Sequence, residues 1–197
     1  MKAVILLLTT VALCSSKVLA GPFERLDSPV AIPEFTLQTH SEQSFTQNDL
    51  LGHWTLVLIG FTSCPDVCPY TLGNLEHVLA ETASKVSPGN LPEVVFLAVD
   101  PARDRQSLKR YVGHFHPDFK GVTGDVAEID TLVNGLDAFY QLEAPDKNGF
   151  YNVRHSADIR IVDPQGRLHA TMETPMNPTS TSEFLLRLQV DYRRNLQ

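Results

Sequence analysis

An almost wholly apolar stretch, Trp54 to Phe61 (WTLVLIGF), limits the folds open to this chain. Such a run, rich in β-branched residues, is typical of a strand that is buried on both faces of a sheet. The segment Cys64–Cys68 (CPDVC) follows directly, and from Pro69 to Val86 apolar residues recur at helical spacing. The two cysteines are therefore predicted to lie between a buried strand and a helix.

The same patterns predict further strands and helices along the chain. They are a short strand at Phe35–Leu37, a buried strand at Val94–Val99, helices at Ser107–Phe115 and from Asp125 to about Tyr140, a strand pair at Ile159–Val162 and Leu168–Met172, and a last helix opened by the capping box Ser180–Glu183. Strands separated by helices imply crossover connections, and the late hairpin adds antiparallel strands. The predicted fold class is α/β: a thioredoxin-like fold, with a central mixed sheet and helices on both faces.

The first twenty residues have the layout of a secretory signal peptide. Lys2 supplies a positive charge, an apolar run extends from Ala3 to Leu13, and a small-residue cleavage site ends at Ala20. That run is shorter than the ~20 apolar residues that span a bilayer. We therefore expect export to the periplasm as a soluble protein, with anchoring by the N-terminus, for example through a lipid on Cys14, as the alternative.

The rest of the sequence is predicted to form one domain. Residues 21–33 carry three prolines and are expected to be an extended arm, and residues 34–193 are expected to be the thioredoxin-like domain. The net charge is −7, and no basic stripe is present, so nucleic-acid binding has no support. No later segment is apolar enough to cross a membrane, so no stable membrane span is expected.

Cys64 and Cys68 are the two cysteines that remain once Cys14 leaves with the signal peptide. At the start of a helix, unpaired N–H groups and the helix dipole favour anions, so the thiol pKa should fall below its free value of about 8.5. Positions i and i+4 share a helix face, so the sulfurs could converge on one ion or form a disulfide. Two thiolates in a proline-flanked loop suit a soft ion, either Cu(I) or zinc, with a third ligand expected.

A structural disulfide is the competing interpretation of the cysteine pair. Closing so short a loop removes little entropy from the unfolded chain. A domain of this size can also bury a core without covalent help, unlike the small cysteine-dense domains of secreted proteins. A metal site or a redox pair is therefore favoured over a structural disulfide, which stays open.

Histidine is the commonest candidate for the third ligand, and the chain has seven of them. His77 lies nine residues beyond Cys68, where helical geometry turns it away from the pair. His114 and His116 are placed at a helix end, where a positive charge is favourable in itself. His155 follows the long loop 144–152, which a thioredoxin-like topology would bring near the first helix, so it is the favoured candidate.

Four segments resemble the Sco/SenC family and occur in that family's order. They are Gly60–Pro69 (GFTSCPDVCP), Val99–Asp104 (VDPARD), Phe115–Phe119 (FHPDF) with Thr123–Gly124 after it, and Tyr151–Ser156 (YNVRHS) followed by Asp163–Gly166. The resemblance covers roughly residues 30–192. It implies a copper chaperone, or a thiol–disulfide reductase, for assembly of the CuA centre of cytochrome c oxidase. The implied partner is subunit II of the oxidase or another copper or thiol protein.

The same resemblance implies roles for individual residues. Cys64, Cys68 and His155 would be the ligands of copper, as Cu(I) or Cu(II), and the cysteines would also form a redox-active pair. Asp100 would assist copper transfer or partner contact, although a helix-start role is equally open. Two positions depart from the family: Arg154 replaces a common acidic residue, and Asp158 a common apolar one.

Two other classes of function stay open at this point. A general thiol oxidoreductase, or a factor in copper or redox homeostasis unconnected with the oxidase, would use the same cysteine pair. A peroxidase is less favoured, because peroxiredoxins place a threonine three positions before the reactive cysteine and this chain has Phe61 there.

Overall fold

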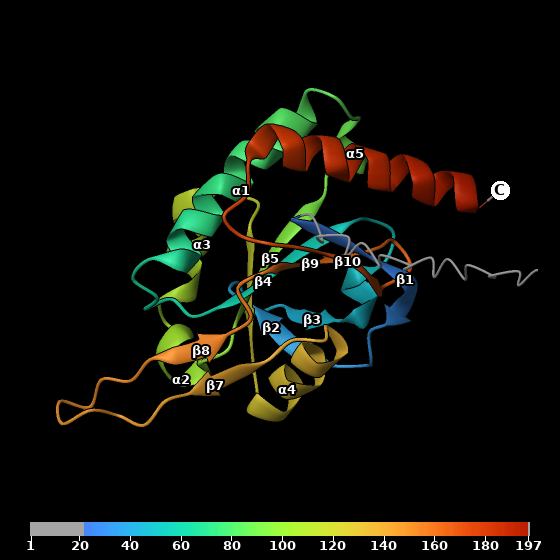
Figure 1. Cartoon of the computed structure of the whole chain (residues 1–197). Coiled ribbons are helices and arrows are strands. Elements are labelled where there is room, and N and C mark those ends of the chain that lie inside the picture. The colour runs from blue at the N-terminus through green and yellow to red at the C-terminus, as the bar shows by residue number, and fades with distance from the viewer. Residues whose placement is uncertain (1–21, 197) are drawn as a thin grey trace, which may run out of the picture.

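An eight-stranded mixed sheet organises the computed structural model, which describes residues 22–196 (Figure 1). In their order across the sheet the strands are β1 (Phe23–Ala31), β10 (Arg167–Met172), β9 (Ile159–Val162), β4 (Thr55–Gly60), β5 (Glu93–Ala98), β6 (Lys120–Thr123), β2 (Thr36–Thr39) and β3 (Ser44–Thr46). Strands β4, β5 and β6 are parallel, and the other neighbours are antiparallel. The predicted signal peptide and Cys14 lie outside the described residues.

Helices cover both faces of this sheet. They are α1 (Val67–Ala83), α3 (Leu108–Phe115) and α5 (Pro178–Asn195) on one face, α4 (Val126–Gly135) and the 3-10 helix η1 (Gln47–Leu50) on the other, and the short segments η2 (Pro88–Asn90) and α2 (Pro101–Asp104) between strands. The predicted fold class is confirmed. Among the helices of residues 22–196, none is both long and apolar enough to cross a membrane.

The alternation of side chains along β4 explains the two cores. Leu56 and Leu58 pack with α1, α3 and α5, whereas Val57 and Ile59 pack with α4. All six residues of β4 are buried, as its unbroken apolar sequence predicts. β4 is therefore a central strand of the sheet, and the cysteine segment follows its C-terminal end.

The N-terminal arm is extended and also belongs to the sheet. Strand β1 pairs antiparallel with β10, with a register shift between Arg25 and Val30. Pro29 lies inside this shift, where no ladder hydrogen bond is required of it. This edge strand was not predicted, because the prolines of residues 21–33 interrupt the strand pattern in the sequence.

Two predicted helix ends are wrong. Helix α4 ends at Gly135 and not near Tyr140, because Asp137 takes a left-handed backbone conformation (φ 49°) that stops the helix. Helix α5 begins at Pro178 rather than Ser180, with Asn177 as its N-cap, since proline is well suited to the first helical position.

A second, two-stranded sheet was not predicted. Strands β7 (Tyr140–Leu142) and β8 (Val153–His155) pair antiparallel outside the main sheet. The loop between them projects from the molecule at the lower left of Figure 1, and residues 141–150 are all exposed. We call residues 140–155 the hairpin arm. Its last residue is His155.

Candidate metal centre

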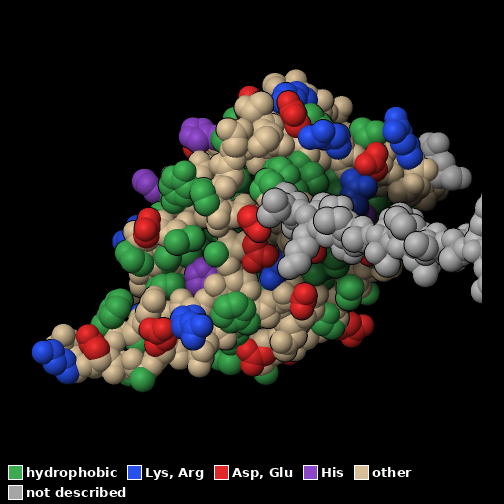
Figure 2. Space-filling model, viewed as in Figure 1, with side chains coloured by type: hydrophobic (Ala, Val, Ile, Leu, Met, Phe, Trp, Pro, Cys, Tyr) green, Lys and Arg blue, Asp and Glu red, His purple; other side chains and the backbone are tan. Residues whose placement is uncertain are grey.

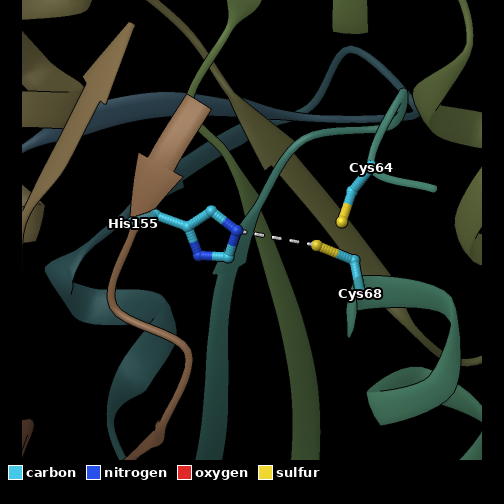
Figure 3. Close-up of side chains that lie close together, drawn as sticks. All are labelled: Cys64, Cys68 and His155. Atoms are coloured by element: carbon cyan, nitrogen blue, oxygen red, sulfur yellow. Dashed lines mark hydrogen bonds between the residues drawn. The ribbon is translucent and has the colours of Figure 1, made fainter. Parts of the chain in front are cut away.

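Three side chains from separate elements converge at the end of β4 (Figure 3). Cys64 lies in the turn after β4, Cys68 is the second residue of α1, and His155 ends β8. Their ligand atoms all lie within 4.8 Å of one another, and the Cys68 Sγ to His155 Nε2 distance is 3.9 Å. Within residues 22–196 this is the one such cluster of three metal-ligating side chains. Both cysteines are free thiols.

The cysteines come together through a turn and not through a shared helix face. Helix α1 begins at Val67, so Cys64 lies outside it, and the Cys64 N–H donates to the Phe61 carbonyl at 3.1 Å. Asp104 stabilises the turn, because its Oδ1 accepts from both the N–H and the hydroxyl of Thr62 at 2.8 Å. The predicted convergence is present, but the i, i+4 argument for it is wrong.

Asp104 was missed by the sequence analysis as a contributor to the site. Its carboxylate is fully buried, and its Oδ2 accepts from the Asp100 N–H at 3.2 Å. Burial raises the pKa of Asp104, against the hydrogen bonds from Thr62, which lower it. Asp104 belongs to the VDPARD motif, so the sequence marked the residue but did not show that it supports the cysteine turn.

Gly60 makes room for the second sulfur. A Cβ at this position would lie 2.7 Å from Cys68 Sγ and 2.7 Å from an atom of the Phe96 ring. Real Cβ atoms do not approach other heavy atoms so closely, so only glycine fits here without movement of its neighbours. Gly60 thus allows the helix that carries Cys68 to approach the end of β4.

The two thiols are not equivalent electrostatically. Hydrogen bonding from the Cys68 thiol lowers the pKa of Cys64 to about 3, helped by His155 and by the backbone N–H groups of Cys68 and Asp66, while burial opposes the shift. The pKa of Cys68 is raised, because it shares this hydrogen bond with Cys64 and is fully buried. The pair therefore holds one thiolate, on Cys64, stabilised in part by N–H groups at the helix start as predicted. For Cys68 the predicted fall in pKa is wrong, because burial and the hydrogen bond with Cys64 outweigh the helix start.

His155 is oriented as a metal ligand would be. Its Nδ1 lies 2.9 Å from the Ser156 carbonyl oxygen, which can only accept, so Nδ1 carries the proton. In the neutral ring the lone pair is then on Nε2, the atom that faces the sulfurs, and this is the form that would bind a metal. The Phe61 ring meets the imidazole edge-on, with ring centroids 6.0 Å apart, and limits its rotation. Two thiol sulfurs and one neutral imidazole nitrogen form a donor set that fits copper.

Asp100 lies outside this cluster of ligands. Its side chain is 1% exposed and forms an ion pair with Arg103, three residues further along. Its carbonyl accepts from the Asp104 N–H at 2.9 Å at the start of α2, but its side chain makes no capping bond. The helix-start role is therefore carried by its backbone, and its carboxylate serves Arg103.

The two departures from the family have local explanations. Asp158 pairs with Arg160, a buried residue that also donates to the Asp137 carbonyl at 2.8 Å and so holds the end of α4. Arg154 is exposed and lines a groove beside the cysteines. Neither side chain is among the converging ligands.

Four of the remaining histidines have structural partners, among them His116, which accepts from the Asp118 N–H at 3.2 Å. His40 accepts from the Gly121 N–H at 3.0 Å, His53 pairs with Glu93 at 3.2 Å, and His169 lies 3.1 Å from Asp163.

The fold and the site together define a thioredoxin-like protein with a dithiol metal centre. A family model described as SCO1/SenC matches residues 24–188, and the chain belongs to this family. It is 33% identical over 172 residues to an SCO2-like protein of Rickettsia conorii, covering 86% of this chain and 82% of that protein.

Two further comparisons extend this result. Identity is 33% over 144 residues with the mitochondrial SCO1 homolog of Homo sapiens, covering 72% of this chain and 47% of the human protein, so the chain matches about half of that relative's length. The crystal structure of Arabidopsis thaliana ScoI with copper bound superposes with a TM-score of 0.72 at 28% identity, covering 80% of this chain and 97% of that one.

Proposed function

We propose that this protein is a copper chaperone that binds one copper ion through Cys64, Cys68 and His155 and passes it to another protein. The observation that carries the proposal is the convergence of these three ligand atoms within 4.8 Å. A copper-bound relative with the same fold supports the choice of metal. Thiolate ligands favour Cu(I), and the neutral imidazole completes a three-coordinate site that leaves room for an incoming ligand.

A groove of about 600 Å³ beside the centre supports delivery to a protein partner. Cys64 and His155 both line it, so a partner's thiolate could reach the ion from this side. Three large apolar side chains along it are exposed: Val67 (43%), Phe139 (53%) and Phe150 (57%). Figure 2 shows apolar side chains on the surface between the hairpin arm, at the lower left, and the helices above it. Exposed apolar surface next to a reactive centre is typical of a protein contact site.

The recipient we propose is the CuA centre in subunit II of cytochrome c oxidase, as membership of the family implies. Copper would move by ligand exchange, with the partner's thiolates replacing His155 and then the cysteines. Delivery to another copper or thiol protein in copper homeostasis is the alternative. Export to the periplasm, with removal of residues 1–20 or retention through the N-terminus, is part of the same proposal.

Thiol–disulfide reduction is a second candidate, favoured by the inequality of the two thiols. The Cys64 thiolate at the groove would attack a partner disulfide, forming a mixed disulfide and releasing one partner thiolate. Cys68 would then lose its proton, attack Cys64 and release the second partner thiolate. Two electrons pass to the partner, and Cys64–Cys68 becomes a disulfide.

An anaerobic titration of the reduced protein with Cu(I) tests the main proposal. We expect one ion per chain, and loss of binding in Cys64→Ser and in Cys68→Ser. The copper-loaded protein is then mixed anaerobically with the reduced soluble domain of oxidase subunit II, the two proteins are separated, and the copper bound to each is measured. Binding without transfer would reject the oxidase as recipient, and the absence of Cu(I) binding would reject the chaperone.

Insulin reduction without copper tests the second candidate. A general oxidoreductase would reduce this unrelated disulfide, whereas a dedicated one would reduce only the oxidised oxidase domain. If neither disulfide is reduced, the redox role is rejected.

A further inference from the structure

The hairpin arm that carries His155 is joined to the rest of the protein by few hydrogen bonds. Its strands β7 and β8 pair only with each other in the part of the chain that the structure describes. At the base of the arm, the Ser156 N–H donates to the Phe139 carbonyl at 3.0 Å. Contacts from the body of the protein must therefore help to set where His155 lies.

Arg103 makes such a contact from α2. Its Nη1 donates to the Tyr151 carbonyl at 2.9 Å. Among the hydrogen bonds of residues 22–196, this is the one that joins the segment 143–152 to the rest of the protein. The guanidinium also lies over the Tyr151 ring of the arm, with Cζ 3.7 Å from the ring centre, which is within range of a cation–π interaction.

The same guanidinium contacts Phe61, and Phe61 contacts the His155 imidazole. Its Cζ lies 5.5 Å from the centre of the Phe61 ring, and Phe61 in turn packs edge-on against His155. Phe61 is 2% exposed and directly follows β4, so it is fixed by the main sheet. Arg103 is thus in contact with the ring that faces His155 and with the segment that leads to it.

The orientation of Arg103 is fixed at its other end. Nε is paired with the buried carboxylate of Asp100, which is part of the turn between β5 and α2. An arginine can serve a carboxylate, a carbonyl and a ring face at once because its five donors lie in one rigid plane. A lysine ammonium could retain the ion pair with Asp100 but has no planar face to stack on Tyr151.

We propose that Arg103 is a positioning residue for the metal centre: it clamps the hairpin arm to the body so that His155 Nε2 faces the two sulfurs. Asp100 then contributes by holding Arg103 and not by touching the ion. This inference rests on the proposed copper site for its binding test, but its structural content concerns the arm alone.

The main variant is Arg103→Lys, which keeps a positive charge beside Asp100. Arg105→Lys is the matched control, since Arg105 follows α2 and is exposed, with a hydrogen bond to Gln38 instead. Cu(I) affinity is measured by competition with a chromophoric chelator. We expect Arg103→Lys to lower the affinity about tenfold, as is usual for residues that orient a metal ligand, and Arg105→Lys to leave it unchanged.

A double-mutant cycle separates positioning from general stability. In a His155→Ala background the imidazole is gone, so Arg103→Lys should have no further effect on Cu(I) affinity. A tenfold loss that persists in this background would overturn the proposal, as would unchanged affinity in Arg103→Lys alone.

Amide hydrogen exchange in the metal-free protein tests the clamp without copper. Peptides covering residues 150–156 should exchange about tenfold faster in Arg103→Lys, while peptides of β4 and α1 stay unchanged. Equal exchange in the arm of both proteins would overturn the clamp. If the wild type binds no Cu(I), the chaperone fails, but this exchange result still decides the role of Arg103.

Discussion

Cys64 and Cys68 are attached to the body of the protein through the central sheet, whereas His155 is attached through a two-stranded sheet outside it. The cysteine turn follows a fully buried strand and is fastened by the buried Asp104. The hairpin arm has exposed residues along most of its length. The two sulfurs are therefore preset by the fold, whereas the imidazole is carried by a strand outside the main sheet that is tied to the core through the buried Val153. This division suits an ion that has to be held and then released.

The first prediction is that Cys68, more than His155, sets the thiolate on Cys64. Because the pKa of Cys64 is lowered to about 3, it should be ionised throughout the range from about pH 5 to 8, and its alkylation by iodoacetamide should change little. An ordinary thiol with a pKa near 8.5 would instead react about 1000-fold faster at pH 8 than at pH 5, because its thiolate fraction rises by that factor. The rate is followed by mass spectrometry of the Cys64 peptide.

Two variants sharpen this first test. His155→Ala should keep the nearly flat profile, because His155 is a lesser cause of the shift than the Cys68 thiol. Cys68→Ala removes the largest cause and should restore a rise with pH. A steep profile in the wild type would contradict the preset thiolate.

The second prediction concerns the anchor beneath the cysteine turn. Asp104→Ala removes an acceptor that serves two groups of Thr62 and the Asp100 N–H, and should lower the free energy of unfolding by about 3 kcal/mol. Urea denaturation measures this change. Asp118→Ala, at a side chain that is 90% exposed, is the control and should stay within about 0.5 kcal/mol of the wild type.

The third prediction is that a change on the hairpin arm affects copper binding strongly and stability little. His155→Ala should weaken Cu(I) binding by about 100-fold, since one of three ligands is lost. The free energy of unfolding should change by less than about 1 kcal/mol, because the imidazole is partly exposed and packs only edge-on against Phe61. The disulfide between the cysteines should still form. Copper competition and urea denaturation are compared with those of His77→Ala, an exposed histidine of α1.

The sequence predicted the elements that one local pattern determines, and it missed elements that form only by pairing with distant segments. The run Trp54–Phe61 predicted a strand buried on both faces and so placed the cysteines beside a helix. Strand β1 and the β7–β8 sheet were missed, because pairing of short or proline-containing segments depends on partners that are remote in sequence.

The same limit applied to the metal centre. The three proposed ligands were predicted from motif and topology, and the structure brings their side chains together. The roles of Asp104 and Arg103 were not foreseen, since both act through contacts with segments more than 40 residues away. A motif such as VDPARD shows that residues belong together without showing what they hold.

The smallest predicted effect tests how tightly the cysteine side is packed. Gly60→Ala would place a methyl group 2.7 Å from Cys68 Sγ and from the Phe96 ring, and should cost about 2 kcal/mol of stability through overpacking. Gly73→Ala in α1 meets open space and should instead stabilise the protein by about 0.5–1 kcal/mol, since alanine favours the helix. Opposite signs in urea denaturation would show that the sulfur lies in a rigid pocket. Equal, small effects would mean that the cysteine turn yields as readily as the arm, and the contrast between the two sides would be lost.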